Sequence, residues 1–152
     1  MAVDSGEGVD MSPIRAFSSK PTRVLFLDDM PIRHEALREA LELPIRYKQV
    51  ELTHAYGFVP FKARLEEAEE PYDVVCLDHD LGDGDAYTGY DAAWEVLRLP
   101  KEKKPSLVVI HSYNVVAADR MYMLLKGTVD RLEKVPYAKE ALVKIILGGK
   151  LV

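Results

Sequence analysis

The sequence feature that most constrains the fold is a fivefold alternation of short apolar blocks with helical patterns, which begins near Thr22. The apolar blocks read as buried strands and cover residues 23–27, 49–54, 72–77, 107–110 and 129–134. The segments between and after them space their apolar residues as helices do, at residues 31 up to Pro44, 58–68, 89–99, 115–126 and 137–147. Because connections between parallel strands nearly always cross right-handedly, five such units predict an open parallel sheet with helices on both faces.

The predicted fold class is α/β, a flavodoxin-like three-layer sandwich whose five parallel strands take the order 2-1-3-4-5. A chain of 152 residues suits one domain rather than two. Residues 1–20 are rich in Gly, Ser and Asp and show no apolar period, so we expect a disordered tail followed by a folded domain at 21–152. In such a sheet, ligands bind beyond the carboxyl ends of the strands, here between the first and third strands.

Composition narrows the classes of function. The single cysteine, Cys76, cannot form a disulfide within the chain, which suits a reducing cytoplasm. The first residues lack the pattern of a signal peptide, and nothing later approaches about 18 consecutive apolar residues, so we expect no membrane segment. The formal charge of −5 argues against binding of long nucleic-acid duplexes, although a short nucleic-acid end can still bind locally.

Most polar side chains that can do chemistry follow three of the predicted strands. They are Asp28 and Asp29 after the first strand, Asp78, His79 and Asp80 after the third, and His111, Ser112 and Asn114 after the fourth. Carboxylates that converge at one edge repel one another unless a cation neutralises them, and hard oxygen ligands suit Mg²⁺ or Mn²⁺. The sequence therefore predicts a divalent metal site at this edge.

The histidines at this edge are candidates for proton transfer, because an imidazole titrates near neutral pH. His79 and His111 have this placement, whereas we interpret His34 and His54 as structural. His111 has the opposite strand parity to Ser112, so both reach one pocket only if the strand bends there.

Four further side chains are candidates for holding phosphate oxygens. Ser112 and Asn114 share strand parity and offer uncharged hydrogen-bond donors. Arg33 lies in the first turn of the first predicted helix, where a guanidinium can lean toward an anion. Lys134 ends the fifth predicted strand and is a candidate for the same anion.

Other chemical signatures are missing from the sequence. It has no G-x-x-x-x-G-K-[ST] phosphate loop and no dinucleotide-binding glycine pattern. The acidic stretch DHDLGDGDAYTGY lacks the spacing and the final glutamate of a calcium loop. The absence of a G-x-S-x-G elbow leaves a serine hydrolase without support.

The strand-end residues resemble those of two-component receiver (CheY-like) domains. Asp28 and Asp29 look like the receiver acidic pair, Asp78 like the phosphoacceptor, Ser112 like the hydroxyl residue and Lys134 like the lysine. The local strings LDHDLG at 77–82, TGYD at 88–91 and HSYN at 111–114 are more similar to an offshoot, the cyclic-phosphate processing receiver family. The chain departs from that pattern at 115–118, which read VVAA where Pro and Gly often follow the asparagine.

The resemblance implies a metal-binding acidic pocket that acts on a cyclic phosphate, such as the 2',3'-cyclic end of an RNA. It implies that Asp28, Asp29 and Asp78 hold the metal. It also implies that a second set faces the substrate, namely His79, Asp80, His111, Ser112 and Asn114.

Three functions agree with these residues. In the first, a metal-dependent phosphodiesterase-type hydrolase uses His79 or His111 to protonate the departing ribose oxygen. In the second, a signalling receiver uses Asp78 as phosphoacceptor, with Ser112 and Lys134 reporting its modification. In the third, the fold binds a ligand of nucleotide size without turnover.

Overall fold

The structure is a computed structural model, and it describes residues 20–148. Except for Lys20, the predicted tail at 1–20 lies outside the described residues, as do the last four residues of the predicted domain. The described elements, in chain order, are β1 (Thr22–Leu27), α2 (Pro31–Ala40), α3 (Glu42–Arg46), β2 (Val50–Ala55), α4 (Phe58–Glu67), β3 (Val74–Leu77), α5 (Gly89–Arg98), the short 3₁₀ helix η1 (Lys101–Lys103), β4 (Leu107–His111), α6 (Val115–Leu125), β5 (Arg131–Val135) and α7 (Lys139–Ile146).

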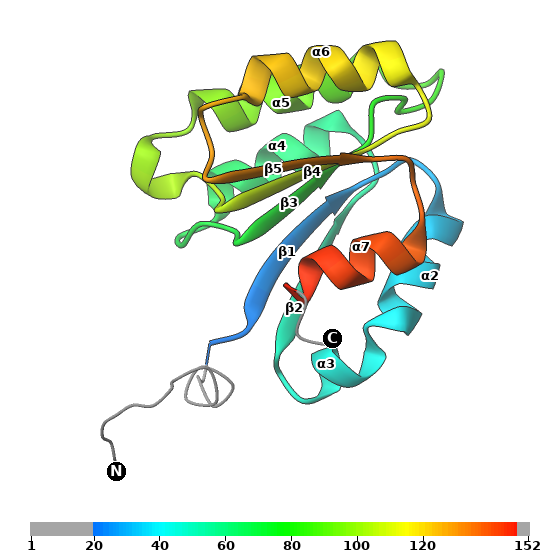
Figure 1. Cartoon of the computed structure of the whole chain (residues 1–152), viewed down its shortest axis with the longest axis vertical. Helices are drawn as coiled ribbons and strands as arrows, with labels where there is room; N and C mark the ends of the chain where they lie inside the picture. The colour runs from blue at the N-terminus through cyan, green and yellow to red at the C-terminus, as the bar shows by residue number, and fades with distance from the viewer. Residues whose placement is uncertain (1–19, 149–152) are drawn as a thin grey trace.

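The strands form one sheet in the order β2-β1-β3-β4-β5, and every neighbouring pair is parallel. This arrangement confirms the flavodoxin-like α/β fold and its strand order. Helices α4, α5 and α6 cover one face of the sheet, and α2, α3 and α7 cover the other (Figure 1). The first connection of the chain runs outward to β2 and the next returns past β1 to β3, so the order reverses at β1.

Each central strand is apolar on both faces because helices cover both. On one face, Leu25 of β1 and Val75 of β3 pack in a core that includes Phe61 of α4. On the other face, Phe26 and Cys76 pack in a core formed with α2 and α7. Strictly alternating side chains therefore divide the sheet residues between two cores.

The strand register sets three polar residues side by side. Leu27 pairs with Leu77, and Leu77 pairs with Ile110, so the next residues in these strands are also neighbours. Those residues are Asp28, Asp78 and His111. By alternation, they point to the same face as Phe26 and Cys76, the face that α2 and α7 cover. The register of the strands is therefore enough to bring these three residues together at the edge where the sequence predicts a metal site.

The prediction that the first helix stops at Pro44 is wrong. Helix α2 ends at Ala40, and Pro44 is the third residue of the separate helix α3. A proline fits there because the first-turn backbone groups of a helix have no intrahelical acceptor, so no hydrogen bond is lost. The other predicted elements are present with ends shifted by at most two residues, and β4 extends through His111.

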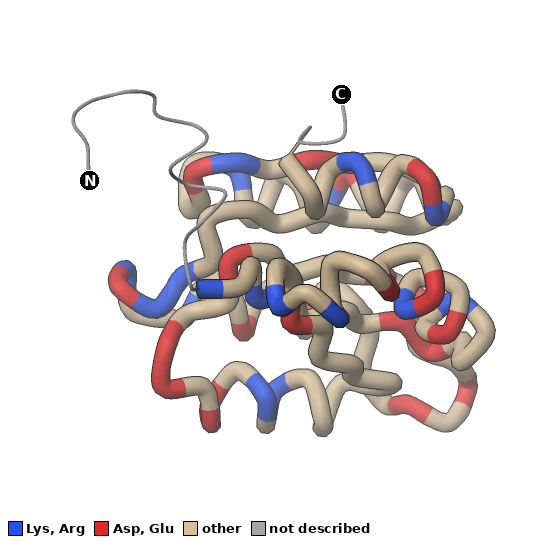
Figure 2. Tube along the Cα trace, turned by 90° about the horizontal axis from the view of Figure 1, so that it is seen from below, with Lys and Arg blue, Asp and Glu red and all other residues tan. Residues whose placement is uncertain are grey.

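Charges are mixed over the described chain. In the view of Figure 2, Lys and Arg are interspersed with Asp and Glu rather than gathered on one face. Between residues 20 and 148, no helix is long and apolar enough to cross a membrane.

Candidate active site at the carboxyl edge

Three buried side chains meet where β1, β3 and β4 end. Asp28 and His111 have no solvent exposure, and Asp78 is 4% exposed. One potential ligand atom from each lies within 4.8 Å of the other two. The closest contact of His111 with a carboxylate joins its Nδ1 to Asp28 Oδ2 at 3.7 Å. We call this set the Asp28–Asp78–His111 cluster.

Backbone amides orient both carboxylates of the cluster. The Met30 amide donates to Asp28 Oδ1 at 2.8 Å, and the His79 amide donates to Asp78 Oδ1 at 2.9 Å. The second oxygen of each carboxylate faces the Arg33 guanidinium, whose Nη1 lies 3.2 Å from Asp28 Oδ2 and 4.0 Å from Asp78 Oδ2. Arg33, predicted to lean toward an anion, thus joins the two carboxylates as their cationic partner.

Burial makes the negative charge of the cluster costly. Burial, followed by the charge of Asp28, raises the pKa of Asp78 to about 8, although the Arg33 charge opposes the shift. Burial also raises the pKa of Asp28, against the opposing effects of the Met30 amide and Arg33. One arginine therefore leaves the two carboxylates short of positive charge, and a further cation would stabilise their ionised forms.

His111 is a neutral imidazole held within the core. Its ring stacks on Phe26 with ring centroids 5.0 Å apart and planes 14° apart. Burial lowers the pKa of His111 to about 3, with a further lowering from the Arg33 charge. The Leu27 backbone opposes the shift, yet neither ring nitrogen makes a hydrogen bond of ordinary geometry. Because buried polar atoms are nearly always partnered, these nitrogens are candidates for binding a ligand.

A tyrosine that the sequence analysis missed completes the wall of the site. The Arg33 guanidinium carbon lies 4.5 Å from the ring centroid of Tyr137, which follows β5. The Tyr137 hydroxyl is buried without a hydrogen-bond partner. Within residues 20–148, the only buried side-chain polar atoms without a partner are this hydroxyl and the two nitrogens of His111. Tyr137 follows a strand end as the predicted residues do, and extending that rule to the fifth strand would have identified it.

His79 and Asp80 form a pair in the segment that follows β3. His79 Nδ1 lies 2.8 Å from Asp80 Oδ1, and the Asp80 side chain is 71% exposed. A carboxylate only accepts hydrogen bonds near neutral pH, so this contact places a proton on His79 Nδ1. The other nitrogen of His79 is then the atom that can exchange a proton.

Ser112 and Asn114 shape the turn between β4 and α6. Ser112 Oγ accepts a hydrogen bond from the Asn114 amide at 3.1 Å, and Asn114 Oδ1 accepts one from the Ala117 amide at 3.1 Å. Asn114 is thus the N-cap of α6, which begins at Val115 without a proline. The hydroxyl proton of Ser112 and the amide protons of Asn114 remain able to donate.

The structure does not bring two predicted site residues into the cluster. The Asp29 carboxylate lies against Gly82, whose positive φ of 87° turns the loop after β3. Its charge still acts on the cluster, since it raises the pKa of both Asp28 and Asp78. Lys134 pairs with Asp119 of α6, and its ammonium lies 5.6 Å from the ring centroid of Tyr122.

Two further histidines support the backbone of Asp28. The buried His34 places Nε2 2.7 Å from the Asp28 carbonyl oxygen and Nδ1 2.7 Å from His54 Nδ1. A carbonyl oxygen only accepts, so His34 carries its proton on Nε2, and its Nδ1 accepts from His54. This hydrogen-bond chain fixes both tautomers and agrees with the structural interpretation of these histidines.

The tautomers provide a prediction for nitrogen NMR. Near neutral pH, we expect His34 as the Nε2–H form and His54 as the Nδ1–H form. Burial lowers the pKa of both rings, and for His54 the charges of His34 and Arg38 add to this effect. The folded chain then binds fewer protons than the unfolded chain just below pH 6.5, so the free energy of unfolding should fall as the pH drops through this range. An Nδ1–H form of His34 in long-range ¹H–¹⁵N spectra would contradict the geometry.

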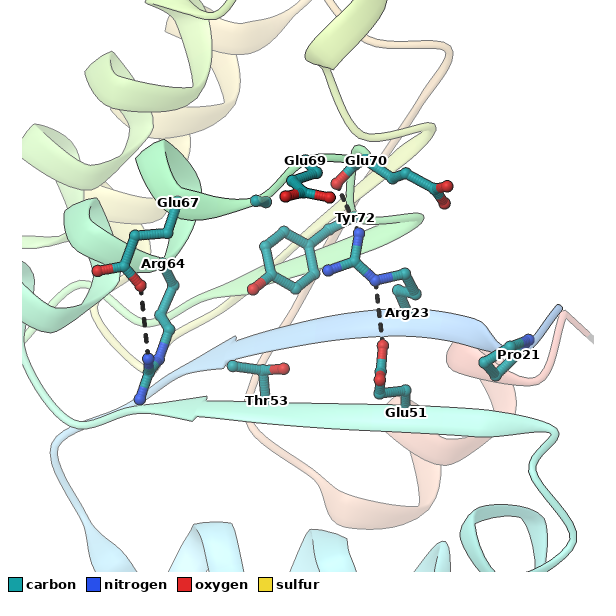
Figure 3. Close-up of a pocket in the computed structure, with 10 residues that line it drawn as sticks. Pro21, Arg23, Glu51, Thr53, Arg64, Glu67, Glu69, Glu70 and Tyr72 are labelled. Carbon is teal, nitrogen blue, oxygen red and sulfur yellow. Dashed lines mark hydrogen bonds and ion pairs between the residues drawn. The ribbon is translucent and has the colours of Figure 1, made fainter.

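A separate hollow of about 580 Å³ lies at the amino end of β1 and β2 (Figure 3). Both of its arginines are already paired. Arg23 donates to Glu51 Oε1 at 3.1 Å and to the Glu70 carbonyl at 2.5 Å, and Arg64 pairs with Glu67 at 3.7 Å. The hollow contains none of the predicted site residues.

Comparison with known proteins places the chain among receiver domains. Residues 23–127 match the family described as the cyclic-phosphate processing receiver domain. No curated protein is similar enough in sequence to match.

Solved structures share the fold at low sequence identity. A structure described as adenylate cyclase from Rhodopirellula baltica has a TM-score of 0.62 at 17% identity, covering 85% of this chain and 87% of that one. The phosphorylated cyanobacterial phytochrome response regulator RcpA has a TM-score of 0.60 at 19% identity, covering 84% and 90%. The Mn²⁺-bound form of response regulator Rcp1 has a TM-score of 0.59 at 20% identity, covering 84% and 91%.

Proposed function

Because the chain belongs to the cyclic-phosphate processing receiver family, we propose that its carboxyl edge binds a cyclic phosphate ester and opens it by hydrolysis with the help of a divalent cation. The observation that carries the proposal is the buried Asp28–Asp78–His111 cluster, in which two carboxylates share one arginine and a neutral imidazole has no hydrogen-bond partner. A structural cluster would have its polar atoms paired.

The donor set fits a divalent cation. Asp28 and Asp78 supply hard oxygen ligands, and His111 is neutral, which is the form in which histidine binds metals. An imidazole beside two carboxylates favours Mn²⁺ over Mg²⁺, which prefers oxygen ligands alone. The receiver structure that holds Mn²⁺ supports this preference by analogy. A cation at these residues would draw negative charge from the phosphoryl oxygens of the substrate.

The remaining side chains suit binding and proton transfer. Arg33 lies beside both carboxylates and can also bind phosphate oxygens, and Ser112 and Asn114 add uncharged donors. In hydrolysis, a water oxygen bonds to phosphorus and releases a proton, the bond from phosphorus to one ribose oxygen breaks, and that ribose oxygen takes a proton. His79 is the better proton donor, because Asp80 orients its ring through Nδ1 and leaves Nε2 available, whereas burial keeps His111 neutral.

The experiment supplies a nucleoside 2',3'-cyclic phosphate together with Mn²⁺ or Mg²⁺ and measures the opened monoester. We expect turnover that EDTA abolishes. Replacing His79 with alanine should lower kcat by about 100-fold or more. The control Lys62→Ala changes an exposed lysine of α4 paired with Glu66, and we expect it to behave as the parent chain. Turnover that survives EDTA or is unaffected by His79→Ala would contradict the proposed roles.

A second candidate function is phosphoacceptance by Asp78. The observation that favours it is the position of Asp78 at the end of β3 in a fold shared with a phosphorylated response regulator. A mass gain of one phosphoryl group on Asp78 after incubation with acetyl phosphate and Mg²⁺, without opening of a cyclic ester, would select this function. If neither reaction occurs, the result favours a binding module of the same fold.

The proposed partner is a phosphate-containing small molecule or an RNA end. The mixed surface charge and the formal charge of −5 support a short ligand rather than a long duplex. A cytoplasmic location remains our proposal, based on the single buried thiol of Cys76.

A further inference from the structure

We call the loops and first helical turns that follow β1, β2, β3 and β4 the rim of the candidate site, and this rim carries exposed apolar and aromatic side chains. Within residues 20–148, twelve large apolar or aromatic side chains are exposed, and eight of them lie in the loops or first helical turns that follow β1, β2, β3 and β4. A charged substrate such as inorganic phosphate gains nothing from such a rim. A phosphate ester that carries a flat apolar group would be stabilised by it.

Among these side chains, Tyr113 is held in place although it is 66% exposed. Its hydroxyl donates to the Tyr137 carbonyl oxygen at 2.9 Å, which fixes the ring at the distal end. Most exposed tyrosines lose side-chain entropy when a ligand orders them, whereas this ring is already ordered. A pre-ordered ring presents its surface for stacking at low entropic cost.

The position of the ring relative to the charges decides what it can stack on. The Arg33 guanidinium carbon lies 5.7 Å from the Tyr113 ring centroid, and the same guanidinium contacts Asp28 and lies near Asp78. The Arg33 guanidinium therefore lies between the Tyr113 ring and the proposed phosphate position. In a nucleotide, the base stands one sugar away from the phosphate, so both groups can be engaged at once.

The loop that follows β3 is less suited to a polynucleotide. It carries Asp80, Asp83 and Asp85, and a chain of phosphates crossing it would be repelled. Tyr113 lies in a different loop, after β4, near Arg33. A single nucleotide or the terminal nucleotide of an RNA fits this distribution of charge better than an internal segment.

We propose that Tyr113 is a base-stacking platform that makes the site selective for nucleoside cyclic phosphates over cyclic phosphates without a base. The inference rests on the proposed function for the position of the phosphate. Stacking of one base on an aromatic side chain changes affinity by about 5- to 100-fold when the aromatic residue is replaced by alanine.

The test compares two phosphate monoesters by calorimetry in Mn²⁺ buffer. Adenosine 3'-monophosphate carries a base, and glycerol 2-phosphate does not. We expect the parent chain to bind the adenosine ester at least about 5-fold more tightly, and Tyr113→Ala to remove this preference while leaving the affinity for glycerol 2-phosphate unchanged. Tyr113→Phe keeps the ring but loses its hydrogen bond, so an intermediate preference is expected.

The matched control is Tyr47→Ala. Tyr47 is equally exposed, at 68%, but it follows α3 on another part of the molecule. It should leave both affinities unchanged. Equal binding of the two esters by the parent chain, or a preference retained in Tyr113→Ala, would overturn the stacking proposal and leave the phosphate site standing. If the parent chain binds neither ester, the stacking proposal fails, whereas the proposed function is tested separately by the opening of the cyclic ester.

Discussion

Replacing Gly89 with alanine is expected to lower the free energy of unfolding by about 3 kcal/mol or more. A Cβ atom at Gly89 would lie 1.9 Å from the Asp78 carbonyl oxygen and 2.7 Å from the His79 Cα. Both contacts are with backbone, so no side-chain rotation can relieve them. Helix propensity alone predicts the opposite result, because alanine is the better helix former.

The close approach at Gly89 also links stability to the candidate site. The Gly89 amide donates to the His79 carbonyl at 2.8 Å, so the start of α5 packs directly on the segment that carries Asp78. If the variant folds, we expect Asp78 to be displaced and Mn²⁺ affinity to fall. This contact gives a physical reason for the glycine in the TGYD string.

Urea denaturation measures the effect of Gly89→Ala, and Gly84→Ala is its matched control. Gly84 lies in the same loop, and a Cβ there would meet no heavy atom within 4 Å. The control should unfold within about 0.5 kcal/mol of the parent chain. Equal denaturation midpoints for the two variants would show that the backbone contact at Gly89 does not affect the free energy of unfolding.

The sheet could be predicted from sequence because its determinants are local and repeated. Five apolar blocks of strand length, each followed by a helical pattern, leave few topologies once connections are right-handed. The break between α2 and α3 escaped prediction because Pro44 reads as a stop, although a proline in the first turn of a new helix costs little.

The sequence predicted which edge of the sheet holds the candidate site, but not which side chains contact one another there. Strand ends that meet at one edge identified Asp28 and Asp78, and the resulting contact at Arg33 follows from its place in the first turn of α2. The strand-end pattern did not distinguish Asp29 from Asp28, and it left the face of His111 open, because that face depends on the strand continuing through residue 111. Alternation assigns a side chain to a face only as far as the strand extends.

Removing the charge of Asp78 is also expected to change the free energy of unfolding. Because Asp78 is buried next to Asp28, we expect Asp78→Asn to stabilise the chain when EDTA removes divalent cations. Near pH 8 and above, the gain in the free energy of unfolding should be at least about 1 kcal/mol, which corresponds to a single pKa unit. Asparagine keeps the acceptor for the His79 amide, so the local hydrogen bond is retained.

The raised pKa of Asp78 determines how the free energy of unfolding changes with pH. Burial raises the pKa of Asp78 from 3.8 to about 8, so the folded chain binds more protons than the unfolded chain between these two values. The free energy of unfolding contributed by Asp78 is therefore greatest at low pH and falls as pH rises from about 4 to about 8. Asp78→Asn should lack this part of the decline, and its gain over the parent chain should grow through the same range.

A divalent cation should make the parent chain more stable than Asp78→Asn, which is the reverse of the order in EDTA. Mn²⁺ must displace the proton of Asp78, so its stabilisation of the parent chain should increase with pH, whereas Asp78→Asn should respond weakly at every pH. Thermal melts at several pH values, with EDTA or with Mn²⁺, measure both effects. A variant that is less stable than the parent chain at pH 8 in EDTA would mean that the Asp78 charge is already compensated within the fold. In that case Arg33 alone neutralises the Asp28–Asp78–His111 cluster, and the charge argument for a bound cation is wrong.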